Sequence, residues 1–273
     1  MKLHPFLTAA MLVAAPAAYA QGDAGAASTT PNADRLSAQM RILGSSPNNL
    51  DALIEAARLS VRVGDPLAAM QFLARAQRVA PADARIAAVR GSALVNTEQP
   101  GEALRQFALA ERGGVRPASF AADRGLALDL LGYPQNAQAD YRLALAQGRD
   151  DEVIRRLALS LGISGDVAES ARVLDPLLRA NDRAAWRVRA CVLAMAGDAA
   201  GADRIAASML PGFGPSLAPF FRRLPALATA DRAFAVHFGR LAPTPERVAD
   251  ARLAPPIVAL SRAAPVQVAA RAA

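Results

Sequence analysis

LDALIEAARLSVRVGDPLAAMQFLARAQRVAPAD, residues 50–83, is followed without interruption by ARIAAVRGSALVNTEQPGEALRQFALAERGGVRP, residues 84–117, and by ASFAADRGLALDLLGYPQNAQADYRLALAQGRDD, residues 118–151. The three stretches have equal length, and similar residue types recur in the same columns. Three columns stand out: Ala69, Ala103 and Ala137, then Leu73, Phe107 and Tyr141, then Ala76, Ala110 and Ala144. A fixed period in this range indicates a repeat protein built from one supersecondary unit.

Each unit is predicted to contain two helices. Apolar residues recur at helical spacing on both sides of a short break, and the breaks are Gly64-Asp65-Pro66, Gln99-Pro100-Gly101 and Gly132-Tyr133-Pro134. The alanine columns let the two helices approach closely, and the large apolar column fills the space one turn further along. A low aromatic content of 5% also favours helices over a β-sandwich. The sequence therefore predicts an all-α solenoid of helix–turn–helix units.

This pattern resembles the tetratricopeptide repeat (TPR) family, whose signature places small residues at positions 8, 20 and 27, an aromatic residue near 24 and proline near 32. The residues that match positions 8 and 32 are Ala57, Gly91, Gly125 and Pro81. The later units depart from the signature, because Val115 and Arg149 stand where the proline is expected. The resemblance implies a TPR solenoid.

Two weaker units follow the three clear ones. Gly165 lies 33 residues after the turn glycine Gly132, and Gly197 lies 32 residues after Gly165. Trp186 falls at position 4 of the last unit, where the TPR family often has tryptophan. The solenoid is therefore predicted over residues 33–210, with a lone first helix at 33–43, clear repeats at 50–151 and degenerate repeats at 152–210.

The ends of the chain are predicted to differ from the solenoid. A solenoid needs polar caps, because each repeat buries its apolar face only against its neighbours. Residues 211–240 are predicted to form a helical cap with helices at Pro215–Arg223 and Thr229–Phe238. Residues 21–32 and 241–273 lack sustained periodicity, and are predicted to be a flexible linker and a flexible tail.

Residues 1–20 are typical of a secretory signal peptide. Lys2 precedes a short apolar run, and Ala18 and Ala20 suit cleavage before Gln21. A retained membrane anchor is the alternative. Gln21, not cysteine, stands directly after the cleavage site, so we expect no lipobox and no lipid anchor attached there. The sequence therefore predicts export to the periplasm.

Arginine dominates the charge of the chain. Lys2 is the only lysine, so removal of the signal lowers the formal charge from +7 to +6 and leaves arginine as the only strongly basic side chain. The arginines are spread along helices rather than gathered in one block with aromatics, which argues against nucleic acid as a ligand. An acidic partner protein, or peripheral contact with an anionic membrane or cell wall, fits this charge. Simple solvation of the helices is the alternative.

The chain offers little catalytic chemistry. His237 is the one histidine beyond the signal, and Cys191 is the one cysteine, which excludes an intrachain disulfide. Both are expected to be structural side chains. No nucleophile elbow, phosphate-binding loop or dinucleotide motif is present, and Asp150-Asp151-Glu152 is expected to start a helix rather than bind metal. Paired carboxylates that meet only in the fold stay open. We therefore expect no enzyme activity, no cofactor and no metal.

In TPR folds the first helix of each repeat lines a concave groove, with positions 2, 5, 9, 12 and 13 facing it. Carried over to this sequence, the resemblance implies a partner-binding groove that mixes arginine with polar and aliphatic side chains. Its candidate residues are Arg58, Arg62, Arg85, Ser92, Asn96, Asp129, Arg155 and Arg187. Arginine forms paired, charge-assisted hydrogen bonds with carboxylates, so the expected ligand is a protein or peptide segment with acidic residues. A solvated helix face is the alternative.

The combination of an export signal with a few repeats, and with the stretches GLALDLLG at 125–132 and LSLGISGD at 159–166, resembles the TPR subunit of bacterial Tad/Flp pilus assembly systems over residues 50–180. That class is usually lipid-anchored, and the missing lipobox departs from it. The resemblance implies a scaffold or adaptor in pilus assembly or secretion.

Two other settings stay open. Residues 224–240 resemble the stretch that precedes the peptidoglycan-binding SPOR domain in certain cell-envelope TPR proteins, although residues 241–273 lack the strand alternation of such a domain. A hydrolase that acts on envelope polymer is the alternative of another class.

Overall fold

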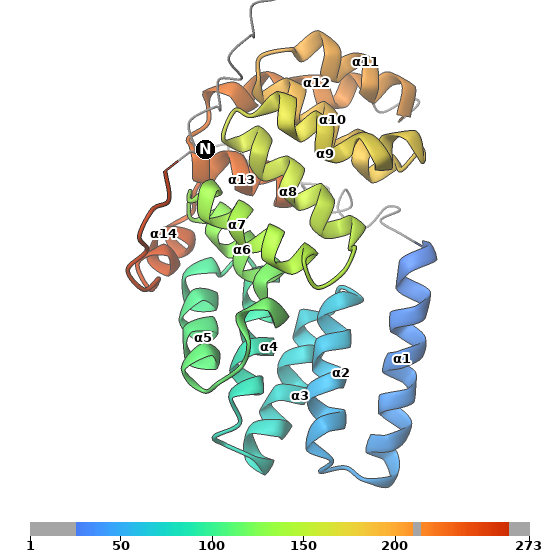
Figure 1. Ribbon diagram of the computed structural model, residues 1–273, viewed down its shortest axis with the longest axis vertical. Coiled ribbons are helices and arrows are strands. Elements are labelled where there is room, and N and C mark those ends of the chain that lie inside the picture. Colours follow the sequence, from blue (N-terminus) through green and yellow to red (C-terminus); the bar gives the residue numbers. More distant parts are fainter. Residues whose placement is uncertain (1–25, 210–213, 262–273) are drawn as a thin grey trace, which may run out of the picture.

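The computed structural model describes residues 26–209 and 214–261, and within these ranges the chain is all-α (Figure 1). Five pairs of helices follow one another, and each pair contains an A helix and the B helix that packs against it. The A helices are α2 (Leu50–Arg62), α4 (Ala84–Asn96), α6 (Ala121–Leu130), α8 (Asp151–Ile163) and α10 (Arg183–Met195). The B helices are α3 (Pro66–Val79), α5 (Pro100–Arg112), α7 (Pro134–Leu145), α9 (Val167–Arg179) and α11 (Ala199–Met209). The all-α, helical-repeat solenoid predicted from the sequence is confirmed.

The breaks between the paired helices follow from proline and glycine. In the three clear repeats the B helix begins at Pro66, Pro100 or Pro134, where the missing N–H of proline costs no hydrogen bond. Gly64 and Gly132 adopt φ angles of 85° and 86°, which glycine reaches without a steric penalty. The breaks therefore turn the chain back on itself at the same place in each repeat.

Within a pair, a glycine on the A helix makes room for an aromatic ring on the B helix. A Cβ atom on Gly91 would lie 2.5 Å from the ring of Phe107, and one on Gly125 would lie 2.8 Å from the ring of Tyr141. Both rings are fully buried. The alanine column Ala69, Ala103 and Ala137 is fully buried as well. The buried alanine column and the glycine–aromatic pairs thus form the packing between paired helices, whereas Pro81 is exposed and Gly132 lies in a turn.

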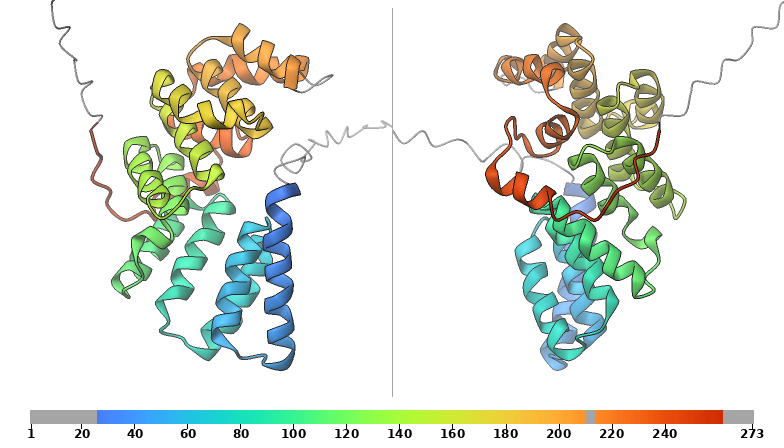
Figure 2. Two further views of the ribbon diagram at one scale, coloured as in Figure 1. Left: turned by 45° about the vertical axis from the view of Figure 1, so that its right-hand side comes forward. Right: turned by 90° about the vertical axis from the view of Figure 1, so that its left-hand side faces the viewer.

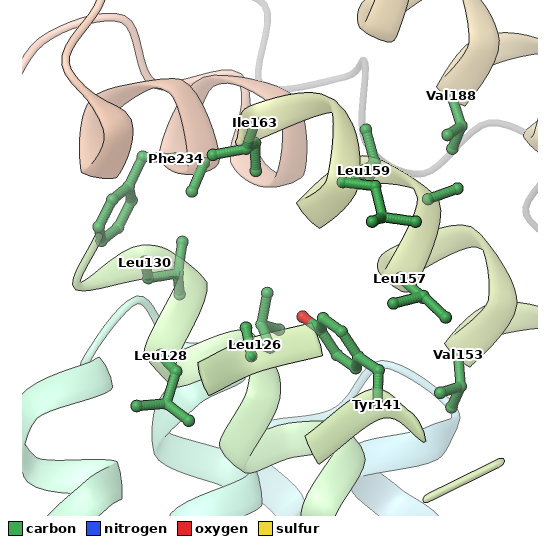
Figure 3. Close-up of a cluster of buried hydrophobic side chains, with 14 of the residues drawn as sticks. Leu126, Leu128, Leu130, Tyr141, Val153, Leu157, Leu159, Ile163, Val188 and Phe234 are labelled. Atoms are coloured by element: carbon green, nitrogen blue, oxygen red, sulfur yellow. The ribbon is translucent and has the colours of Figure 1, made fainter. Parts of the chain in front are cut away.

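The buried side chains form two hydrophobic clusters. One involves α1 to α4, and the other runs from α4 to α13. Figure 3 shows part of the second, in which Phe234 lies with Leu130 of α6 and Ile163 of α8. Trp186 lies half-buried on α10, and its indole Nε1 is buried without a hydrogen-bond partner in the described part of the chain.

The N-terminal helix α1 (Ala26–Ser45) is longer than the helix expected at 33–43. It includes residues 26–32 of the expected linker, and it packs along α2. Alanine and the contact with α2 both favour extension of the helix.

The signal peptide expected at 1–20 lies outside the described residues. None of the described helices combines the length and apolarity needed to cross a lipid bilayer.

The C-terminal part begins as an end cap and then folds back along the solenoid (Figure 2). Helix α12 (Gly214–Arg223) packs on α11 and α10, whereas α13 (Thr229–Phe238) packs on α6 and α8, and the short 3₁₀ helix η3 (Leu224–Ala226) joins them. Helix α14 (Pro245–Ala251) then packs on α5. The two cap helices lie where the sequence predicts them, but the second reaches back to the third and fourth repeats.

The flexible tail predicted from residue 241 is wrong for residues 245–251, which form helix α14. The carboxylate of Asp250 accepts the backbone N–H groups of Gly101, at 2.7 Å, and of Glu102, at 3.1 Å. It thereby caps α5, whose own N-cap residue Gln99 makes no side-chain cap. Further along, the amide side chain of Asn136 hydrogen-bonds the backbone of residues 258 and 260. The segment is fixed by partners more than 100 residues away.

Candidate partner-binding groove

A groove of about 1350 Å³ runs along the A helices of the solenoid. Its walls include the A helices, the connection between α7 and α8, and residues Val236 and His237 of α13. Seven of the eight residues predicted for a partner groove line it: Arg58, Arg62, Arg85, Ser92, Asn96, Arg155 and Arg187. The structure therefore brings these residues together on one surface. Their binding of a partner stays a prediction.

Asp129, the eighth predicted residue, is wrongly placed by sequence reasoning. It is fully buried and faces α7 and α8 instead of the groove. One carboxylate oxygen accepts the hydroxyl of Tyr141 at 3.0 Å, and the other accepts the hydroxyl of Ser160 at 2.7 Å. Burial raises the pKa of Asp129 to about 8, against the opposing effect of these two hydrogen bonds. Asp129 therefore belongs to the packing between two repeats.

Charge is distributed unevenly along the groove. The lining includes eight arginines and five carboxylates, which leaves an excess of positive charge. The lining residues from α2 and α4 include arginines but no carboxylate. All five lining carboxylates come from α6 onwards: Asp123, Asp150, Asp151, Glu152 and Asp182. The groove is thus positive at its N-terminal end and of mixed charge at its C-terminal end.

Acidic neighbours orient the arginines at the N-terminal end. Arg58 pairs with Glu55 at 2.8 Å, and Arg85 pairs with Asp51 of the preceding repeat at 2.8 Å. Arg85 also donates to Asp83, and this hydrogen bond holds the pKa of Asp83 below its usual range. These arginines are about half exposed. Their remaining N–H groups are therefore positioned to bind an incoming carboxylate.

A chain of ion pairs crosses the floor at the C-terminal end. Arg156 pairs with Asp123 of α6 at 3.3 Å and with Glu152 at 3.1 Å. Arg155 pairs with the same Glu152 at 3.0 Å and also with Asp182, the residue before α10. Desolvation by neighbouring side chains opposes the charge on Glu152, but the two arginines hold its pKa below the usual range. Sequence reasoning missed Arg156 and Asp123, although their separation of 33 residues is close to the repeat length.

A weaker contact joins the two ends of the groove. The guanidinium of Arg62, at the end of α2, lies 4.0 Å from a carboxylate oxygen of Asp150, the residue before α8. The other oxygen of Asp150 accepts the backbone N–H groups of Glu152 and Val153. The acidic run at 150–152 therefore starts a helix, as expected, and also faces the first repeat.

Cys191 and His237 both line the groove. Burial raises the pKa of the Cys191 thiol to about 12, although Arg187 opposes this effect. Burial, followed by the charge of Arg156, lowers the pKa of His237 to about 4. At neutral pH the cysteine is therefore a thiol and the histidine is neutral.

In the described residues, no group of three or more His, Cys, Asp or Glu side chains is placed to hold a metal ion.

No protein-family model and no curated protein matches this chain.

Proposed function

We propose that this chain is a non-enzymatic scaffold of the TPR type that acts in the periplasm and holds a partner protein in the groove. The observation that carries the proposal is the gathering of Arg58, Arg62 and Arg85 on one surface built from successive A helices. Such a surface can follow a peptide over several repeats, because each repeat contributes side chains at the same positions. A partner segment with acidic residues fits the excess of arginine.

The chemistry of the groove supports a scaffold better than an enzyme. A nucleophilic cysteine acts as a thiolate, whereas the raised pKa of Cys191 keeps its proton in place. Arg155 and Arg156 hold the pKa of the Glu152 carboxylate below its usual range, which leaves it a poor proton donor.

The proposed setting is pilus assembly or secretion, on the strength of the sequence resemblance over residues 50–180. Export to the periplasm rests on the signal-like segment at 1–20. A cell-envelope setting is the alternative outcome of the experiment below.

Affinity capture from the periplasmic fraction, read by mass spectrometry, tests the proposal. The bait is compared with the triple variant Arg58→Glu, Arg62→Glu, Arg85→Glu, and with the control Arg179→Glu, which changes an exposed arginine of α9 outside the groove. We expect the triple variant to lose the partner and the control to keep it. Equal capture by all three proteins contradicts the groove assignment.

Pilus or secretion proteins in the captured fraction support the first setting, and murein-associated proteins support the second. Turnover of envelope polymer by the purified protein contradicts the proposal that the chain is no enzyme.

A further inference from the structure

Two rims face each other across the mouth of the groove, one bearing arginines and the other carboxylates. Most of these side chains also have an oppositely charged neighbour on their own rim, such as Glu55 beside Arg58, Arg149 beside Asp151, and Arg155 beside Glu152. The arginine rim consists of Arg58, Arg62 and Arg85, whose side chains are 47%, 56% and 45% exposed. The carboxylate rim consists of Asp150, Asp151 and Glu152, whose side chains are 41%, 49% and 55% exposed. Both rims are accessible to a partner.

The Arg62–Asp150 contact closes the mouth between these rims. Helix α2 packs on α1, α3 and α4, whereas α8 packs on α6, α7, α9, α10 and α13. The contact therefore joins the first and fourth repeats through side chains that reach across the opening. An exposed ion pair of this kind contributes little to stability, because solvent screens both charges. A ligand can replace it at little cost.

The two rims discriminate between ligands by charge. A wholly acidic segment that binds Arg62 leaves Asp150 without this partner, and a wholly basic one that binds Asp150 leaves Arg62 without it, so each breaks the contact and replaces only one half of it. A segment with an acidic part and a basic part replaces both halves of the Arg62–Asp150 contact. The carboxylate oxygen of Asp150 that faces Arg62 then accepts a hydrogen bond from the basic residue of the ligand. Its other oxygen continues to cap α8.

We propose that the groove selects a partner segment of mixed charge, whose carboxylates bind the arginine rim and whose basic residue binds the carboxylate rim in place of Arg62. This inference rests on the proposed partner-binding function and specifies the chemistry of the partner.

Fluorescence anisotropy with three labelled peptides of equal length tests it on the purified chain. One peptide carries a glutamate block followed by a lysine block, one carries glutamates only, and one carries lysines only. At low ionic strength we expect the two-block peptide to bind about tenfold more tightly than either of the others, which corresponds to about 1.4 kcal/mol. Added salt should weaken its binding.

Two variants test whether the preference for the two-block peptide depends on Asp150. Asp150→Arg should remove the preference for the two-block peptide over the glutamate peptide, and Arg179→Glu should leave the preference intact. The inference is overturned if the glutamate peptide binds as tightly as the two-block peptide, if no peptide binds, or if Asp150→Arg retains the preference. The periplasmic capture experiment decides the proposed function separately, because it does not depend on these peptides.

Discussion

Asp250 caps α5 by accepting the backbone N–H of Gly101 at 2.7 Å, across a separation of 149 residues. Loss of an N-cap side chain typically costs about 1 kcal/mol. We therefore expect Asp250→Ala to lower the free energy of unfolding by about that amount. Urea denaturation followed by circular dichroism measures the change.

The control for this variant is Asp175→Ala, which removes an exposed carboxylate of α9. Equal stability of the Asp250→Ala variant and the wild type would show that the cap contributes nothing. Hydrogen exchange should also show faster exchange at residues 101 and 102 in the variant, because their N–H groups lose their partner.

Gly91 and Phe107 should be energetically coupled. An added Cβ at Gly91 meets the buried ring at 2.5 Å, so we expect Gly91→Ala to destabilise the fold by about 1–3 kcal/mol. The first repeat has Ala57 and Leu73 in the same two columns. Gly91→Ala with Phe107→Leu should therefore cost less than the sum of the two single changes. A double-mutant cycle measures this coupling, and strict additivity would refute it.

The stability of the fold should decrease as pH rises through the range in which Asp129 ionises. The pKa of Asp129 is about 8 in the folded chain, compared with its ordinary value of 3.8. Between these values the folded state binds a proton that the unfolded chain has released, so the free energy of unfolding falls with increasing pH. The stabilising contribution of the proton on Asp129 is complete below about pH 4 and is lost above about pH 8.

Asp129→Asn isolates this contribution. The amide keeps an acceptor for the Tyr141 hydroxyl and places a donor toward Ser160, whose hydroxyl can donate to the carbonyl of Pro134. We expect the variant to lose less stability than the wild type between pH 5 and pH 8.5, as measured by urea denaturation. Parallel pH profiles for the two proteins would exclude ionisation of Asp129 as the cause.

The Arg62–Asp150 contact should limit how far the groove opens. Spin labels at Leu67→Cys on α3 and Arg172→Cys on α9, both exposed sites, report the separation of the first and fourth repeats when Cys191 is replaced by alanine. We expect Asp150→Arg to shift the distance distribution to longer values. The charge swap Arg62→Glu with Asp150→Arg should restore it. Identical distributions for all variants would show that the contact does not restrain the mouth.

Local sequence patterns predict the solenoid because its packing repeats. Pro66, Pro100 and Pro134 mark the start of three B helices, and the small and aromatic columns identify the contacts inside each pair. These features depend on residues within one repeat length of each other. The same locality explains why seven of the eight predicted groove residues line one surface.

The features that sequence reasoning missed depend on particular tertiary contacts that do not recur from repeat to repeat. Asp129 occupies a position expected to face the groove, yet the hydroxyls of Tyr141 and Ser160 hold it between repeats. Helix α14 is short, and its attachment depends on Asp250 reaching the N-terminus of α5. No periodicity within residues 241–261 reveals a partner in the second repeat.

The return of α13 and α14 along the solenoid alters how the fold should come apart. In an open array each repeat is stabilised only by its neighbours, so unfolding spreads from either end. Here the C-terminal segment packs on α5, α6 and α8 and so connects three repeats, the second, third and fourth, from outside the array. These repeats should consequently unfold as one cooperative block, while α1 to α3, whose buried side chains belong to the other hydrophobic cluster, fray first.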